Sequence, residues 1–100
     1  MAVAAENVQT IFRLPKMVVE NYAGAEYAYI PLGEYVVAAR GVCGGRPTIK
    51  YTRLDARHVI SMLNMGDSHQ QIAERHKIPI VAIDEAVTLS SLYDYEESYA

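Results

Sequence analysis

Four residues that commonly begin or end helices divide residues 55–93 into three short segments. Asp55 and Ser68 are favourable N-caps, Gly66 is a favourable terminator, and Pro79 suits the first turn of a helix. Between them, apolar side chains recur at the i, i+3, i+4, i+7 spacing of a helix that buries one face. They are Ala56, Val59, Ile60 and Leu63, and then Ile80, Ile83, Ala86 and Val87. The sequence therefore predicts helices over about 55–65, 68–76 and 80–93, arranged as a helix-turn-helix domain.

Residues 26–39 have the pattern of a β-hairpin. Side chains from Glu26 to Ile30 alternate at period two and are rich in β-formers, and residues 31–34 have the composition of a turn. Residues 35–39 follow as the return strand. An isolated hairpin is marginally stable in water, so this one must pack on the helices or extend a partner's sheet. Residues 8–19, in contrast, fit a short amphipathic helix interrupted at Pro15.

The predicted fold class is therefore α+β, mainly α. An N-terminal arm over residues 1–40 carries the hairpin, with strands over about 26–30 and 35–39, and a tri-helical domain occupies residues 41–100. A glycine-rich loop over residues 41–47 and a short extended segment over residues 48–51 join the two.

Several small motifs in this order resemble a bacterial and cyanobacterial family called domain of unknown function 433. They are Gly44-Gly45-Arg46-Pro47-Thr48-Ile49, Thr52-Arg53-Leu54, Met65-Gly66, Ser68 to Ile72, and Glu85-Ala86. The resemblance covers about residues 41–92 and implies a homeodomain-like tri-helical fold. Some relatives are antitoxins that neutralise a PIN-domain ribonuclease, so it also implies an antitoxin or transcriptional regulator. Tyr51 departs from the pattern, because many members have glycine there, and a tyrosine makes the backbone less permissive.

Charge is distributed unevenly along the chain. Residues 40–77 hold seven Lys and Arg against three Asp and Glu, whereas residues 78–100 hold five acids and no Lys or Arg. The basic side chains best suited to meet DNA phosphates are Arg46, Lys50, Arg53 and Arg57. The first turns of the third helix, however, contain no Arg, Lys, Asn or Gln to pair with base edges, and they carry Asp84 and Glu85. We expect that helix to serve core or subunit contacts, and Arg53 has an alternative role in fixing the start of the first helix.

The eight tyrosines favour half-buried sheets and interfaces, since each has an apolar ring and a polar tip. Stacking of single-stranded bases is one alternative, but it needs a basic groove, and residues 1–39 hold four acids against two basic residues. The predicted contact between subunits of a homodimer or larger homo-oligomer is formed by Tyr27, Tyr29, Tyr35 and Val37.

No pattern of catalytic or cofactor-binding residues is recognisable. The glycine-rich loop lacks the Gly-Lys-Ser/Thr ending of a phosphate-binding loop. Histidines 58, 69 and 76 and Cys43 match no zinc spacing, and the neighbouring acids Asp84 and Glu85 fit a solvated surface. We expect no metal, no cofactor and no enzymatic activity.

One cysteine, no basic leader segment and no run of about 18 apolar residues favour a cytoplasmic bacterial protein. The predicted function is a non-enzymatic regulatory or interaction module, with duplex DNA or a PIN-domain toxin as further partners. The alternative is a structural or protein-binding homo-oligomer that binds no DNA.

Overall fold

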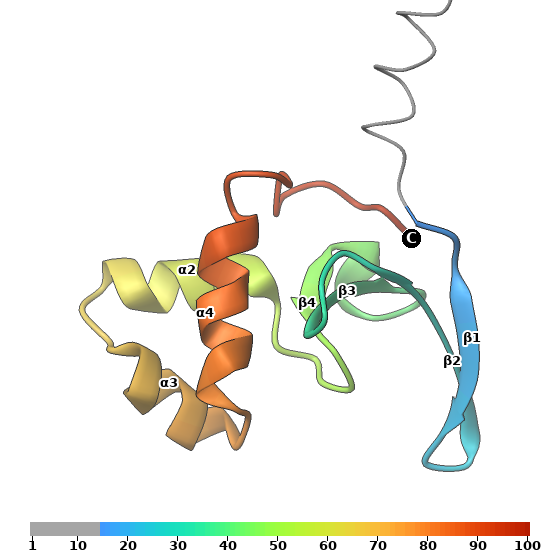
Figure 1. Cartoon of the computed structure of the whole chain (residues 1–100), viewed down its shortest axis with the longest axis horizontal. Helices are drawn as coiled ribbons and strands as arrows, with labels where there is room; N and C mark the ends of the chain where they lie inside the picture. Colours follow the sequence, from blue (N-terminus) through green and yellow to red (C-terminus); the bar gives the residue numbers. More distant parts are fainter. Residues whose placement is uncertain (1–14) are drawn as a thin grey trace, which may run out of the picture.

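A computed structural model describes residues 15–100, in which a four-stranded antiparallel sheet precedes three helices (Figure 1). The strands are β1 (Val18–Tyr22), β2 (Ala25–Pro31), β3 (Val36–Ala39) and β4 (Pro47–Ile49), paired in that order. A short 3-10 turn, η1 (Cys43–Gly45), joins β3 to β4. The helices are α2 (Ala56–Asn64), α3 (His69–His76) and α4 (Ile80–Leu89).

The predicted fold class, mainly α with an N-terminal hairpin arm, is wrong, because the hairpin of β2 and β3 is the middle of a larger sheet. On one side the hairpin is extended by β1, which includes residues 18 and 19 of the predicted amphipathic helix. Residues 8–14 of that predicted helix lie outside the described residues. A turn at Ala23 and Gly24, both with positive φ (53° and 80°), joins β1 to β2. Positive φ at both central residues matches the right-handed twist of a two-residue hairpin.

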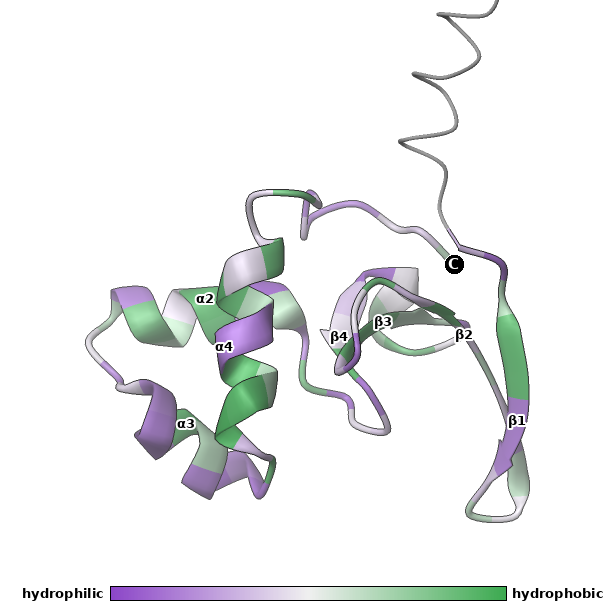
Figure 2. Ribbon diagram, viewed as in Figure 1, coloured by the Kyte–Doolittle hydropathy of each residue, from purple (hydrophilic) through white to green (hydrophobic). Residues whose placement is uncertain are grey.

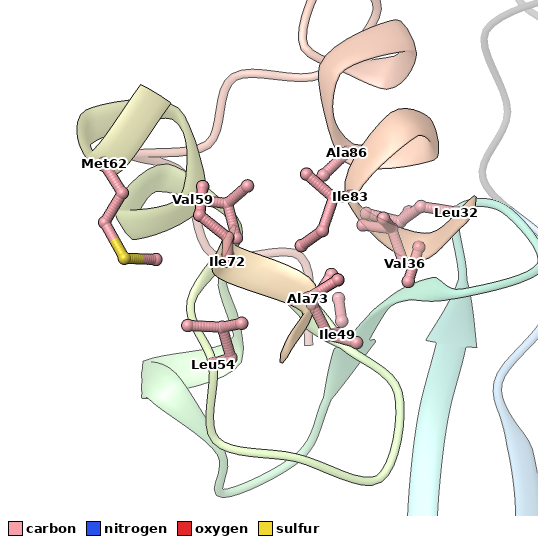
Figure 3. Packing of buried hydrophobic residues seen from close by; sticks show 12 residues of the cluster. Leu32, Val36, Ile49, Leu54, Val59, Met62, Ile72, Ala73, Ile83 and Ala86 are labelled. Atoms are coloured by element: carbon pink, nitrogen blue, oxygen red, sulfur yellow. The ribbon is translucent and has the colours of Figure 1, made fainter. Parts of the chain in front are cut away.

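Sheet and helices share one hydrophobic core, which explains why the hairpin is not a separate arm. Leu32, Val36 and Ile49 from the sheet region pack with side chains from all three helices (Figure 3). The helical members are Val59, Met62, Ile72, Ala73, Ala82, Ile83 and Ala86, and the largest of them that are fully buried are Ile72, Ile83 and Val59. The core thus depends on residues up to about 50 positions apart in the chain.

Side chains of β3 point alternately to the two faces of the sheet, and both faces are buried there. Val36 and Ala38 face the helices, whereas Val37 and Ala39 pack with Tyr29 on the opposite side. All four residues of β3 are buried, as expected for a strand with packing on both faces.

Helix boundaries follow local capping chemistry. The Asp55 carboxylate accepts a hydrogen bond from the backbone N–H of Arg57 (3.2 Å), and Ser68 forms a capping box with Gln71. The helix α4 ends at Leu89, earlier than the predicted end near 93. Beyond it the hydroxyls of Ser90 and Ser91 donate to nearby backbone carbonyls, which competes with continuation of the helix.

Glu85 joins α4 to the turn between β2 and β3. Its carboxylate accepts three backbone N–H bonds, from Glu34 (3.0 Å), Tyr35 (2.7 Å) and Val36 (2.8 Å). Gly33 leaves room for this carboxylate, since a Cβ there would lie 2.4 Å from Glu85 Oε1. The expectation of a solvated Glu85 is wrong, because the turn that surrounds it is distant in sequence. We call these contacts the Glu85 clasp.

Candidate interaction surfaces

The strand β1 lies at the edge of the sheet and, within residues 15–100, pairs only with β2. The hairpin of β1 and β2 extends away from the helices (Figure 1). No side chain of β1 is buried; Val18, Val19 and Tyr22 are 38%, 59% and 46% exposed. Figure 2 shows the apolar end of this strand on the outside of the molecule. The strand begins with two exposed valines and continues with Glu20 and Asn21, and it contains no proline or lysine, the residues that most commonly protect edge strands.

The turn determines which backbone groups of β1 are free. In a two-residue hairpin the residues that flank the turn, here Tyr22 and Ala25, form a hydrogen-bonded pair. Bonding alternates along an antiparallel ladder, so Glu20 also bonds toward β2, while Val19 and Asn21 direct their N–H and C=O groups outward. The open edge therefore offers two residues with unused backbone donors and acceptors.

Four tyrosines hold this hairpin against the loop that follows β4. We call Tyr22, Tyr27, Tyr29 and Tyr51 the tyrosine cluster. The rings of Tyr22 and Tyr51 are stacked with centroids 4.2 Å apart, and Tyr27 lies 5.2 Å from both Tyr29 and Tyr51. The hydroxyl of Tyr27 also accepts the backbone N–H of Tyr51 (3.0 Å). These contacts fix the hairpin relative to the body of the protein.

Two charged side chains complete the tyrosine cluster. Glu20 accepts hydrogen bonds from the hydroxyls of Tyr29 (3.4 Å) and Tyr51. The bond to Glu20 raises the pKa of Tyr51 above its ordinary value, and desolvation raises the pKa of Tyr27. The Lys50 ammonium lies over the rings of Tyr29 (4.7 Å) and Tyr51 (4.9 Å), and its contact with Tyr29 raises its pKa. Lys50, which was predicted to contact DNA phosphates, therefore contacts aromatic rings of its own chain instead.

Tyr51 has a left-handed backbone, with φ at 65°, which is strained for a residue with a side chain. This is the position at which the resembling family often has glycine. Stacking on Tyr22 and the bond to Glu20 offset the strain. The departure from glycine is therefore explained by the β1–β2 hairpin, because Tyr51 is one of the side chains that hold it.

Replacing Tyr51 with glycine should loosen the hairpin while leaving the fold intact. Glycine adopts positive φ without strain, but it removes the ring on which Tyr22 stacks. We expect the β1 amides that bond toward β2, those of Glu20 and Tyr22, to exchange with solvent about tenfold faster in hydrogen-exchange measurements, and amides of α2 to be unchanged. Tyr51→Phe, which keeps the ring and loses only the bond to Glu20, is the matched control. Equal exchange in Y51G and wild type would show that the stack does not hold the hairpin.

Two of the four residues nominated for DNA phosphates are paired with carboxylates. Arg46 and Arg57 both lie 3.2 Å from the Asp55 carboxylate, and Arg57 also contacts Glu96 at 2.9 Å. The bond to Glu96 and the charge of Asp55 raise the pKa of Arg57. This network joins the start of α2 to residues before β4 and to the C-terminal segment, which no local pattern could indicate.

Arg53 is different from the other nominated residues. Its side chain is exposed, and within the described residues it makes no ion pair or side-chain hydrogen bond. The alternative role predicted for Arg53, fixing the start of the first helix, belongs instead to Thr52, whose hydroxyl donates to Ile49 O (2.7 Å) and accepts from Leu54 N (3.0 Å). Arg53 thus remains available for a ligand.

The outward face of α4 is apolar and acidic. Ile80, Val81 and Val87 are 45%, 46% and 37% exposed, and the Asp84 carboxylate lies 2.6 Å from Nδ1 of His69. None of these side chains presents the paired donors and acceptors that read base edges in the major groove.

The residues predicted to form a subunit interface lie mostly inside the protomer. Tyr29 (5% exposed) and Val37 (0%) belong to the second buried face, with Tyr27 packed against them. Tyr35 is half-buried against the main core. The exposed valines among the described strands are instead Val18 and Val19, which sequence reasoning missed as interface residues. Gly24, flanked by two β-forming segments, was the signal that could have revealed their strand.

The three histidines belong to two helices. His58 lies in α2 and His69 and His76 at opposite ends of α3, while Cys43 donates from Sγ to Arg53 O (3.3 Å). In residues 15–100 no three His, Cys, Asp or Glu side chains converge as metal ligands would. Nor does any helix in that range have the length and apolar character needed to cross a bilayer.

Comparison with known proteins identifies one similarity. A family model described as protein of unknown function (DUF433) matches residues 36–88, from the start of β3 to near the end of α4. No curated protein and no solved structure matches the chain. The match therefore spans the sheet–helix core and leaves the β1–β2 hairpin outside it.

Proposed function

Because the chain belongs to DUF433, a family of unknown function, we propose its role from its own surfaces: a non-enzymatic interaction module that assembles with a second copy of itself. The free edge of β1 carries this proposal. Its side chains join neither buried cluster, and within residues 15–100 no strand pairs with the outward backbone groups of Val19 and Asn21. Pairing with another strand would satisfy these groups and cover exposed valines.

A second copy fits this edge because an antiparallel pair of identical strands is self-complementary. A twofold axis beside Val19 places the two Val19 side chains opposite each other and Val18 opposite the partner's Glu20. An axis beside Glu20 would instead place two carboxylates opposite each other, which is destabilising. We place the axis of the proposed dimer at Val19, where the two protomers form one continuous sheet.

Replacing Val19 with lysine should convert the dimer to a monomer. The twofold axis places the two lysines next to each other, so the variant combines charge repulsion with loss of apolar contact. Sedimentation or light scattering should give twice the 11.1 kDa chain mass for wild type and 11.1 kDa for V19K. Val81→Lys makes the same change on the exposed face of α4 and should remain dimeric. A monomeric wild type, or dissociation by V81K alone, would contradict the proposal.

A DNA-binding regulator or antitoxin is the other function that the sequence suggested, and the surfaces favour it less. Arg46 and Arg57 are paired with carboxylates, Lys50 lies on tyrosine rings, and α4 presents apolar and acidic side chains. Phosphate-driven binding weakens steeply with salt. A low-salt titration with duplex DNA that gives such binding, or a stable complex with a PIN-domain ribonuclease, would replace assembly as the main role.

A further inference from the structure

We propose that a hollow between the β4–α2 loop, α2 and α3 binds a phosphate group. Its lining is Thr52, Arg53, Leu54, His58 and His76, and its volume is about 380 Å³. We call it the Arg53 hollow. It lies on the helical side of the molecule, so the inference is independent of assembly through β1.

Three elements position the polar groups of the Arg53 hollow. The loop is held on both sides of Arg53, because the N–H of Thr52 donates to Ile49 O (3.1 Å) and the carbonyl of the buried Leu54 accepts the N–H of Ile49 (3.0 Å). His58 lies in the first turns of α2, and His76 is the last residue of α3. One arginine and two histidines from separate elements therefore line the same hollow, together with Thr52 and the apolar side chain of Leu54.

The charge around this hollow is unbalanced. No carboxylate is among its lining residues, and Arg53 has no carboxylate within ion-pair distance in the described part of the chain. The nearest acid in sequence, Asp55, already contacts Arg46 and Arg57. The adjoining hollow shares His58 but contains Asp55 and Glu96, which neutralise its arginine. Of the two, only the Arg53 hollow would gain charge balance from an anion.

Phosphate is the anion that this set of donors suits. An arginine side chain offers a planar set of N–H donors that matches two phosphate oxygens, and charged histidines add single donors. A water occupies about 30 Å³ in the liquid, so the hollow has room for a phosphate and part of the molecule that carries it. Free phosphate, a phosphate ester and a DNA backbone share this chemistry.

Nuclear magnetic resonance of the full chain with inorganic phosphate tests the proposal, at about pH 6, where histidine side chains carry charge. The imidazole signals of His58 and His76 should shift and saturate. Those of His69, which is paired with Asp84, should not. Sodium chloride at equal ionic strength should not reproduce the shifts. Shifts of all three histidines without saturation would overturn the site.

Arg53→Gln should weaken phosphate binding about tenfold or more, the loss expected for one charge-assisted bond. Arg75→Gln removes the same charge from an arginine paired with Asp67, outside the hollow, and should leave the affinity unchanged. Equal affinities of R53Q and wild type would contradict the assignment. Competition by adenosine monophosphate and by a short DNA duplex distinguishes the possible ligands. Displacement of inorganic phosphate by the monophosphate alone indicates a site for a small phosphate ester. Displacement by both indicates a site that also admits the phosphates of a DNA backbone.

Discussion

Glu85→Ala is expected to destabilise the protein by about 3 kcal/mol, because it leaves three backbone N–H groups without their carboxylate acceptor. We take about 1 kcal/mol for each bond, the value of an ordinary hydrogen bond and less than that of a buried bond to a charged acceptor, because the turn is partly open to solvent. For a domain of 100 residues this corresponds to a Tm lower by more than about 10 °C. Thermal and urea denaturation measure it.

Glu74→Ala is the matched control for this prediction. Glu74 is also a helical glutamate, but it is exposed on α3 and its side chain contacts only that of Gln70 (3.0 Å) among the described residues. Its replacement should change the free energy of unfolding by less than about 0.5 kcal/mol. If E85A and E74A were equally stable, Glu85 would not hold α4 to the sheet.

Gly33→Ala should destabilise the protein by a similar amount, about 2–3 kcal/mol, for a related reason. A Cβ at this position would lie 2.4 Å from Glu85 Oε1 and 2.8 Å from Leu89 Cδ1, so the carboxylate must leave its three donors. The φ of Gly33 does not lie in the left-handed region, and backbone strain therefore contributes little. The effect should come from the displaced carboxylate, as measured by urea denaturation.

A double-mutant cycle separates this mechanism from simple overpacking. Once Glu85 is alanine, the methyl group at position 33 no longer meets a carboxylate, and G33A should cost less than about 1 kcal/mol in that background. Additive effects of G33A and E85A would mean that the methyl group acts through Leu89 instead. Gly41→Ala is unsuitable as a control, because Gly41 has a φ of 75° and an alanine there would destabilise the protein through backbone strain.

The family assignment was predictable because its motifs are short and lie in order along the chain, and the match to residues 36–88 confirms it. The roles of the surface residues were harder to predict from the sequence. Arg46 and Arg57 were nominated for phosphate from charge alone, since their partners Asp55 and Glu96 are up to about 40 residues away. Tyr29 and Val37 were nominated for a subunit interface because a tyrosine-rich strand does not reveal which face its own chain covers.

Local signals in the sequence determined where the helices begin, at Asp55, Ser68 and Pro79, because caps and apolar stripes act over three or four residues. Tertiary structure alone decided that the hairpin joins a four-stranded sheet and that Glu85 accepts bonds from a turn 50 positions earlier. It also decided that Arg53 lines a hollow with two histidines and has no ion-pair partner among residues 15–100. Strand pairing and charge pairing depend on which distant segments meet in space. The free energy that selects those contacts comes from burying the shared core, and a sequence pattern read over a few residues does not contain it.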